Sequence, residues 1–95
     1  IIVSDNITLD LSKSTVTCGE QEIDLTKNEL RILHLLVKNK GLIVSRDSIM
    51  EALWQSNEFV DDNTLTVNIN RLRKKLEGIE ASDYIKTRRG QGYYV

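Results

Sequence analysis

The sequence holds few of the side chains on which metal sites and covalent catalysis depend. It has one cysteine, Cys18, and one histidine, His34, so neither an internal disulfide nor the usual four-ligand zinc site can form. They are also too few to supply a nucleophile, a base and an orienting group. We expect Cys18 to pack or stay idle, and His34 to lie on a helix flank. The sequence therefore predicts no enzyme, no catalytic residue, no metal and no other cofactor.

Proline and long apolar runs are missing as well. The apolar runs reach only about three or four residues, far short of a membrane span, and we expect no signal peptide. Without proline there is no proline-rich linker. The 95 residues, 40% hydrophobic and 28% charged, fit one globular domain over residues 1–95. Because the first residue is Ile1 rather than Met, we expect a processed chain or a piece of a longer protein.

The formal net charge of −1 by itself argues against nucleic-acid binding, since binders usually carry an excess of basic residues. The charge is unevenly distributed along the chain, however. Residues 1–60 hold six basic and nine acidic side chains, whereas residues 63–95 hold seven basic and three acidic ones. The C-terminal third would therefore be the part that turns toward phosphate.

The periodicity of apolar residues predicts strands first and helices afterwards. Residues 1–24 read as a small antiparallel sheet, because apolar and polar residues alternate over 7–11 and β-branched residues follow at 15–17. A capping box at residues 26–29 begins a first helix, which Gly41 ends. Residues 42–44 read as a strand fragment. Ser45 caps a second helix that ends at Trp54, whose ring we expect in the core.

The third helix is expected from Asp61 and Asp62, which serve as N-cap and acidic first turn, to about residue 77. Four apolar residues fall within about 60° of one another at 100° per residue and form the core stripe: Leu65, Ile69, Leu72 and Leu76. Val67 lies on the opposite, polar face, where a thymine methyl is the apolar partner that a DNA major groove offers. Asn and Arg beside it can pair with adenine and guanine edges. The alternative is an ordinary solvated face with basic residues stabilising the helix dipole.

Residues 84–95 predict a basic β-hairpin. Arg88 and Arg89 precede the turn Gly90-Gln91-Gly92, and an arginine-bearing hairpin tip suits a narrow minor groove. The two glycines would supply the positive φ of the turn. A phosphate-binding Gly-x-Gly-x-x-Gly loop is the competing interpretation, but residue 95 is Val and no helix follows. Helix-turn-helix followed by such a hairpin predicts a winged helix.

Five sequence blocks in order and spacing resemble the signature of the OmpR/PhoB family across essentially the whole chain: LTKNEL at 25–30, VSRD at 44–47, LW at 53–54, NRLRKKL at 70–76 and RGQGY at 89–93. The resemblance implies the C-terminal effector domain of a bacterial two-component response regulator. Its fold would be an α+β winged helix-turn-helix, with an N-terminal antiparallel sheet, three helices and a C-terminal hairpin wing. Residues 45–76 further resemble the GraR and BceR branch, which responds to peptide antibiotics.

The resemblance also implies where DNA is contacted, with residues 62–77 in the major groove and the wing, 86–93, in the minor groove. Six side chains would face bases: Thr64, Thr66, Val67, Asn68, Asn70 and Arg71. Five residues would face phosphates: Asn63, Arg73, Lys74, Lys75 and Thr87. Arg88 and Arg89 would enter the minor groove. Some relatives have Arg or Asp near the start of this helix where this chain has Asn63 and Thr66, so their base preference does not transfer.

The same resemblance implies the partners. These are double-stranded DNA with tandem half-sites about one helical turn apart, RNA polymerase, and a sensor kinase acting through a receiver domain that lies outside this chain. A homodimer would form chiefly through that receiver domain, and the location would be cytoplasmic. Glu58 and Phe59 lie in the polymerase-contact loop, although Phe59 packed in the core is an equal alternative. A winged-helix module that docks an acidic protein is the remaining alternative function.

Overall fold

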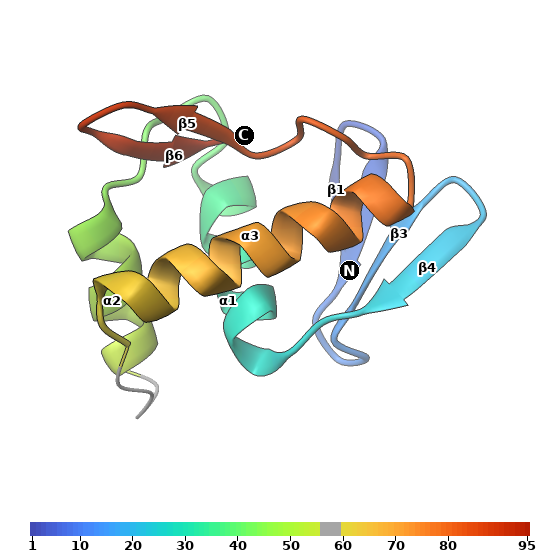
Figure 1. The fold of residues 1–95 in the computed structure, drawn as a ribbon. Coiled ribbons are helices and arrows are strands. Elements are labelled where there is room, and N and C mark those ends of the chain that lie inside the picture. Colours follow the sequence, from blue (N-terminus) through green and yellow to red (C-terminus); the bar gives the residue numbers. More distant parts are fainter. Residues whose placement is uncertain (56–59) are drawn as a thin grey trace.

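The computed structural model describes residues 1–55 and 60–95, which form a sheet, three helices and a hairpin (Figure 1). The N-terminal sheet contains β1 (Ile2–Ser4), β2 (Ile7–Asp10), β3 (Thr15–Cys18) and β4 (Gln21–Asp24). These strands are antiparallel and adjacent in sequence order. Leu9 pairs with Val16, so the two side chains lie on the same face of the sheet, and both are buried. The α+β class and the expected meander are confirmed.

Each helix begins where a side chain satisfies its first backbone amides. Thr26 caps α1 (Lys27–Lys38) in a reciprocal capping box with Glu29, as the sequence predicts. Ser45 caps α2 (Arg46–Trp54) by accepting from the Ser48 amide at 3.1 Å. Asp61 caps α3 (Asp62–Gly78) by accepting from the Thr64 amide at 2.8 Å. Local cap chemistry therefore sets the start of all three helices.

The core joins the three helices to the sheet. The largest fully buried apolar side chains are Ile7, Leu9, Ile32, Leu33, Leu36, Ile49, Leu53, Leu65, Ile69, Leu72 and Leu76. The predicted stripe of α3 is thus wholly buried. Trp54 differs from its prediction, because it is 48% exposed and its indole nitrogen donates to the Val60 carbonyl at 3.1 Å. Leu53 fills the core at the end of α2, so the next residue points outward.

The hairpin contains β5 (Lys86–Arg88) and β6 (Gly92–Tyr94), and it packs on the segment between α1 and α2. Val44 forms a two-way backbone bridge with Tyr93, so of the strand fragment predicted at 42–44 only Val44 pairs as a strand would. Gly92 makes this close approach possible. With φ at +150°, a Cβ on residue 92 would lie 2.1 Å from the Val44 carbonyl oxygen, so only glycine fits.

Candidate nucleic-acid interface

The outer face of α3 is a continuous polar surface with one apolar member. Its exposed residues are Asn63, Thr64, Thr66, Val67, Asn70, Arg71, Lys74 and, near the C-terminal end, Glu77. Val67 is 44% exposed although it lies in the middle of the helix, where the opposite face is fully packed. The surface offers amide, hydroxyl, guanidinium and methyl groups at one helix face. These are the groups that read base edges in a major groove.

Asn68 does not belong to this exposed surface, in disagreement with its expected base-facing role. The residue is 7% exposed, and its side-chain amide donates to the Thr64 carbonyl one turn earlier at 2.9 Å. At 100° per residue it lies beside the apolar stripe, about 40° from Leu72. A helical wheel places it on a flank, and packing against neighbouring elements decides that this flank is covered.

Lys75 also departs from its expected role as a phosphate contact. Its ammonium donates to the Glu29 carboxylate at 2.6 Å and to the Asp24 carbonyl at 3.0 Å. Glu29 is only 1% exposed. Burial on its own would raise the pKa of Glu29, but hydrogen bonds from Lys75 and from the Thr26 amide outweigh it and lower that pKa. Lys75 therefore ties α3 to α1 and the sheet instead of facing outward.

Arg73 is likewise turned inward. Its guanidinium donates to the Ile85 carbonyl at 3.3 Å and to the Thr87 hydroxyl, so it joins α3 to the first strand of the wing. These contacts disagree with an outward role at phosphate. Lys74, the residue between the two inward-turned basic side chains, is exposed. Of the three consecutive basic residues, Lys74 is thus the one on the outer surface.

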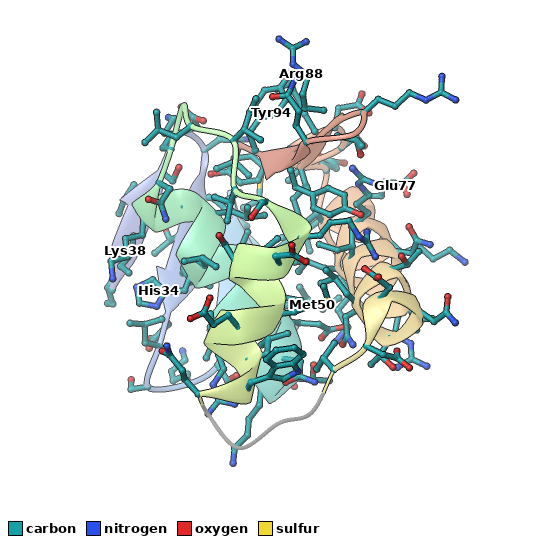
Figure 2. All side chains as sticks on the ribbon, turned by 90° about the vertical axis from the view of Figure 1, so that its left-hand side faces the viewer. His34, Lys38, Met50, Glu77, Arg88 and Tyr94 are labelled. Atoms are coloured by element: carbon teal, nitrogen blue, oxygen red, sulfur yellow. The ribbon has the colours of Figure 1, made fainter. Side chains whose placement is uncertain are left out.

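The wing places its side chains on two faces. Thr87 faces α3, where it accepts from Arg73, and its strand neighbours Lys86 and Arg88 consequently lie on the opposite face. Figure 2 shows the Arg88 side chain projecting outward from the top of the molecule. The Lys86 ammonium lies 5.9 Å from the centre of the Tyr94 ring. The wing is therefore basic on its outer face and anchored on its inner face.

The tip of the wing is a tight turn. Arg89 and Gln91 are exposed there, and the Gln91 amide donates to the Arg88 carbonyl at 2.9 Å. Gly90 has a φ of +75°. Together with Gly92 it supplies the left-handed conformations that the sequence predicts for the turn. Arg89 thus sits at the most protruding part of the hairpin loop, as a residue entering a groove would need to.

Two residues that the sequence reading left without a role organise this surface. Arg46, the first residue of α2, donates to Asp62 at the start of α3 and to the Tyr93 hydroxyl in the wing. A groove between α2 and the wing is lined by both Arg46 and Tyr93. Periodicity could not identify them, because their partners are 16 and 47 residues away in the sequence.

The described residues contain neither a cluster of metal ligands nor a membrane-spanning helix, and Asp61 acts as a helix cap. Across residues 1–55 and 60–95, no group of three His, Cys, Asp or Glu side chains is placed to hold a metal ion. In the same ranges no helix is long and apolar enough to cross a membrane. The Asp61 carboxylate, a helix cap, has a lowered pKa because the Thr64 amide donates to it. Glu58 and Phe59, expected in a polymerase-contact loop, lie outside the described residues.

Known proteins resemble the chain in sequence and in structure. The family model described as "Transcriptional regulatory protein, C terminal" matches residues 20–95. The response regulator protein GraR of Staphylococcus saprophyticus is 52% identical over 85 residues, covering 90% of this chain but 38% of that protein. A GraR from Staphylococcus aureus strain Newman is 53% identical over the same lengths. The chain thus spans about two fifths of the curated relatives it matches.

Solved structures of regulator domains also resemble the chain. The C-terminal domain of the nisin resistance regulator NsrR superposes with a TM-score of 0.87 at 38% identity, covering 97% of this chain and 93% of that one. The Klebsiella pneumoniae RstA DNA-binding domain, solved in complex with the RstA box, gives a TM-score of 0.79 at 31% identity, covering 98% and 93%. Together with the winged-helix architecture and the five sequence blocks, these matches show that the chain belongs to the family of C-terminal domains of transcriptional regulatory proteins, of the OmpR/PhoB type.

Proposed function

We propose that the chain binds double-stranded DNA sequence-specifically, as the output domain of a two-component transcriptional regulator. The observation that carries this proposal is the outer face of α3, where an exposed valine lies among Thr, Asn, Arg and Lys side chains beside a basic wing. On a solvated helix face Val67 gains no burial, whereas in a major groove it would pack against thymine methyl groups. The DNA-bound relative RstA supports the same function.

Different residues would contribute affinity and selectivity. Thr64, Thr66, Val67, Asn70 and Arg71 are the proposed base contacts, since all five are exposed on α3. Lys74 and Asn63 are the proposed phosphate contacts on that helix, and the backbone of Thr87 a further one in the wing. Arg89 and Arg88 would approach the minor groove. Phosphate contacts supply most of the affinity and are weakened by salt, while base contacts set the preferred sequence.

A single domain of this size offers a small DNA-binding surface, so useful occupancy requires two copies on tandem half-sites about one helical turn apart. The full-length protein would also contain a receiver domain that accepts the signal of a sensor kinase and holds the homodimer together. Residues 55–60 would contact RNA polymerase, and the protein would act in the cytoplasm. The similarity to GraR and to a nisin resistance regulator supports a role in the response to peptide antibiotics.

Selection of bound duplexes from a random DNA library, followed by footprinting of the enriched sequence, tests the function. We expect an enriched motif of one half-site, with protection of one major-groove segment and the adjacent minor groove. An interaction module that docks acidic proteins would bind duplexes through charge alone. Enrichment of no motif, with equal affinity for all duplexes at each salt concentration, would contradict the proposal and favour that alternative.

A further inference from the structure

Arg46 connects the three elements that would meet DNA. From the start of α2, its Nε donates to the Asp62 carboxylate at 3.1 Å, and one Nη donates to the Asp62 carbonyl at 2.8 Å. The same Nη donates to the Thr66 hydroxyl oxygen at 2.9 Å, and the other Nη to the Tyr93 hydroxyl. The Arg46 side chain is 32% exposed. A planar guanidinium can hold these partners at once, in fixed directions, which a lysine cannot.

Tyr93 is the point at which the wing is held. Tyr93 is 7% exposed, and two guanidinium groups approach its ring, with Arg46 at 5.8 Å and Arg73 at 5.6 Å from the ring centre. The two arginines come from α2 and α3, and Arg73 also donates to Thr87 on the neighbouring strand. The angle between the wing and α3 is therefore set by contacts from both helices to one buried ring.

Thr66 has a different relation to Arg46, because Thr66 is exposed on the proposed base-reading face. A hydroxyl group has one hydrogen to donate and two lone pairs that accept. Arg46 occupies a lone pair of the Thr66 oxygen. The Thr66 O–H must point away from that donor, so the hydroxyl keeps its hydrogen to donate and has only one lone pair left with which to accept.

We propose that Arg46 is a positioning residue that determines base specificity, acting through Thr66 and Tyr93 without itself reading a base. Through Thr66 it favours an acceptor on the base edge, such as guanine O6 or N7, adenine N7 or thymine O4, over the amino groups of adenine and cytosine. Through Tyr93 it fixes where the wing enters the minor groove relative to α3. This inference rests on the proposed DNA-binding function.

The test uses the 95-residue chain and the duplex enriched by the unaltered protein, together with every single-base-pair variant of that duplex. Four substitutions are compared: Arg46→Lys, Arg46→Gln, Thr66→Val and Thr66→Ser, with Arg31→Lys on α1 as the matched control. The Arg46→Lys/Thr66→Val double variant completes a double-mutant cycle, which measures the coupling between the two residues. Affinities are measured at several salt concentrations, and thermal unfolding identifies variants that do not fold. Tyr93→Phe, which removes only the hydroxyl, serves if an Arg46 variant fails to fold.

We expect Arg46→Lys to lose discrimination by roughly 3- to 10-fold at one or two base pairs, the size of one hydrogen bond. Thr66→Val should lose discrimination at the same base pairs, and Thr66→Ser should keep it. At those base pairs the double variant should discriminate as well as Thr66→Val does. Arg46→Gln should leave the slope of log affinity against log salt unchanged. Tyr93→Phe and Arg46→Lys should both weaken protection of the minor groove, and Arg31→Lys should change none of these quantities.

Three results would overturn the inference while leaving the proposed function intact. One is unchanged discrimination in Arg46→Lys. Another is losses by Arg46→Lys and Thr66→Val that fall at different base pairs or simply add. The third is a loss of affinity in Arg46→Gln that is the same for all duplexes. If the slope of log affinity against log salt also became smaller by about one, Arg46 would be a phosphate contact. If selection enriches no duplex, the proposed function fails, and this inference fails with it.

Discussion

Replacing Lys75 by methionine should destabilise the fold strongly while leaving phosphate contacts unchanged. The substitution keeps an unbranched side chain, one atom shorter, and removes the ammonium that lies 2.6 Å from the buried Glu29 carboxylate. Breaking a buried ion pair by removing one partner costs about 3–5 kcal/mol, because the other charge stays buried. Since Lys75 is 29% exposed and Glu29 keeps its bond from the Thr26 amide, we expect about 2–4 kcal/mol.

The matched control is Lys74→Met, one residue earlier on the exposed face of α3. Urea unfolding followed by circular dichroism gives the free energy of unfolding of each variant. A loss of 1 kcal/mol lowers the melting temperature of a domain of this size by about 4–8 °C, so Lys75→Met should melt roughly 10–25 °C earlier. Lys74→Met should unfold like the parent chain but bind DNA with a salt slope smaller by about one. Equal stability of the two variants, within about 0.5 kcal/mol, would refute this reasoning.

The pH dependence of the Lys75→Met effect follows from the pKa of Glu29. In the parent chain this pKa is lowered, so the ion pair stabilises the fold above the unfolded-state pKa and is lost as the pH falls through the lower folded-state pKa. Without Lys75, only the Thr26 hydrogen bonds lower the pKa of Glu29 against the effect of burial, so this pKa lies higher than in the parent chain and stability depends less on the ionised carboxylate. The stability gap between the parent chain and Lys75→Met should therefore be widest near neutral pH and narrow on acidification. A gap that is constant from neutral pH to pH 3 would contradict the assigned ion pair.

Two further predictions concern positions where packing decides the outcome. Gly92→Ala should lower the free energy of unfolding by more than about 3 kcal/mol or detach the wing from Val44. At Gly78 no atom lies within 4 Å of the added carbon, so Gly78→Ala should be neutral or slightly stabilising in the same unfolding assay. Asn68→Ala should lower the free energy of unfolding by about 1 kcal/mol and leave base preference unchanged. Asn70→Ala should leave the free energy of unfolding unchanged and alter base preference. A changed base preference in Asn68→Ala would show that this side chain turns outward to DNA.

Sequence patterns predicted the elements whose causes are local. A helix cap or a capping box involves residues three apart, so Thr26, Ser45 and Asp61 could each be read as a helix start. The apolar stripe of α3 and the glycine turn of the wing are equally local. Such features depend on the backbone and on neighbours within one turn, and tertiary packing does not alter them.

The errors fall where distant parts of the chain meet. Lys75 looks like its neighbour Lys74 on a helical wheel, and the wheel holds no sign that Glu29, 46 residues away, approaches it. Asn68 becomes buried for the same reason, and Trp54 becomes half exposed because Leu53 already fills the core. Arg46 received no role because its contacts to α3 and the wing exist only after folding. Composition and the family resemblance predicted that α3 and the wing form the surface toward DNA. Long-range contacts decide which side chains on these elements point outward.

Arg71 offers the most direct test of base reading by α3. The residue is exposed on the outer face, and among residues 1–55 and 60–95 no ion pair engages it. The measurement is the affinity of the parent chain and of Arg71→Ala for the enriched duplex and for a scrambled duplex of equal length and salt. We expect Arg71→Ala to lose about 1–3 kcal/mol on the enriched duplex and little on the scrambled one, so that discrimination falls. Unchanged affinities for both duplexes would contradict the claim that α3 reads DNA sequence.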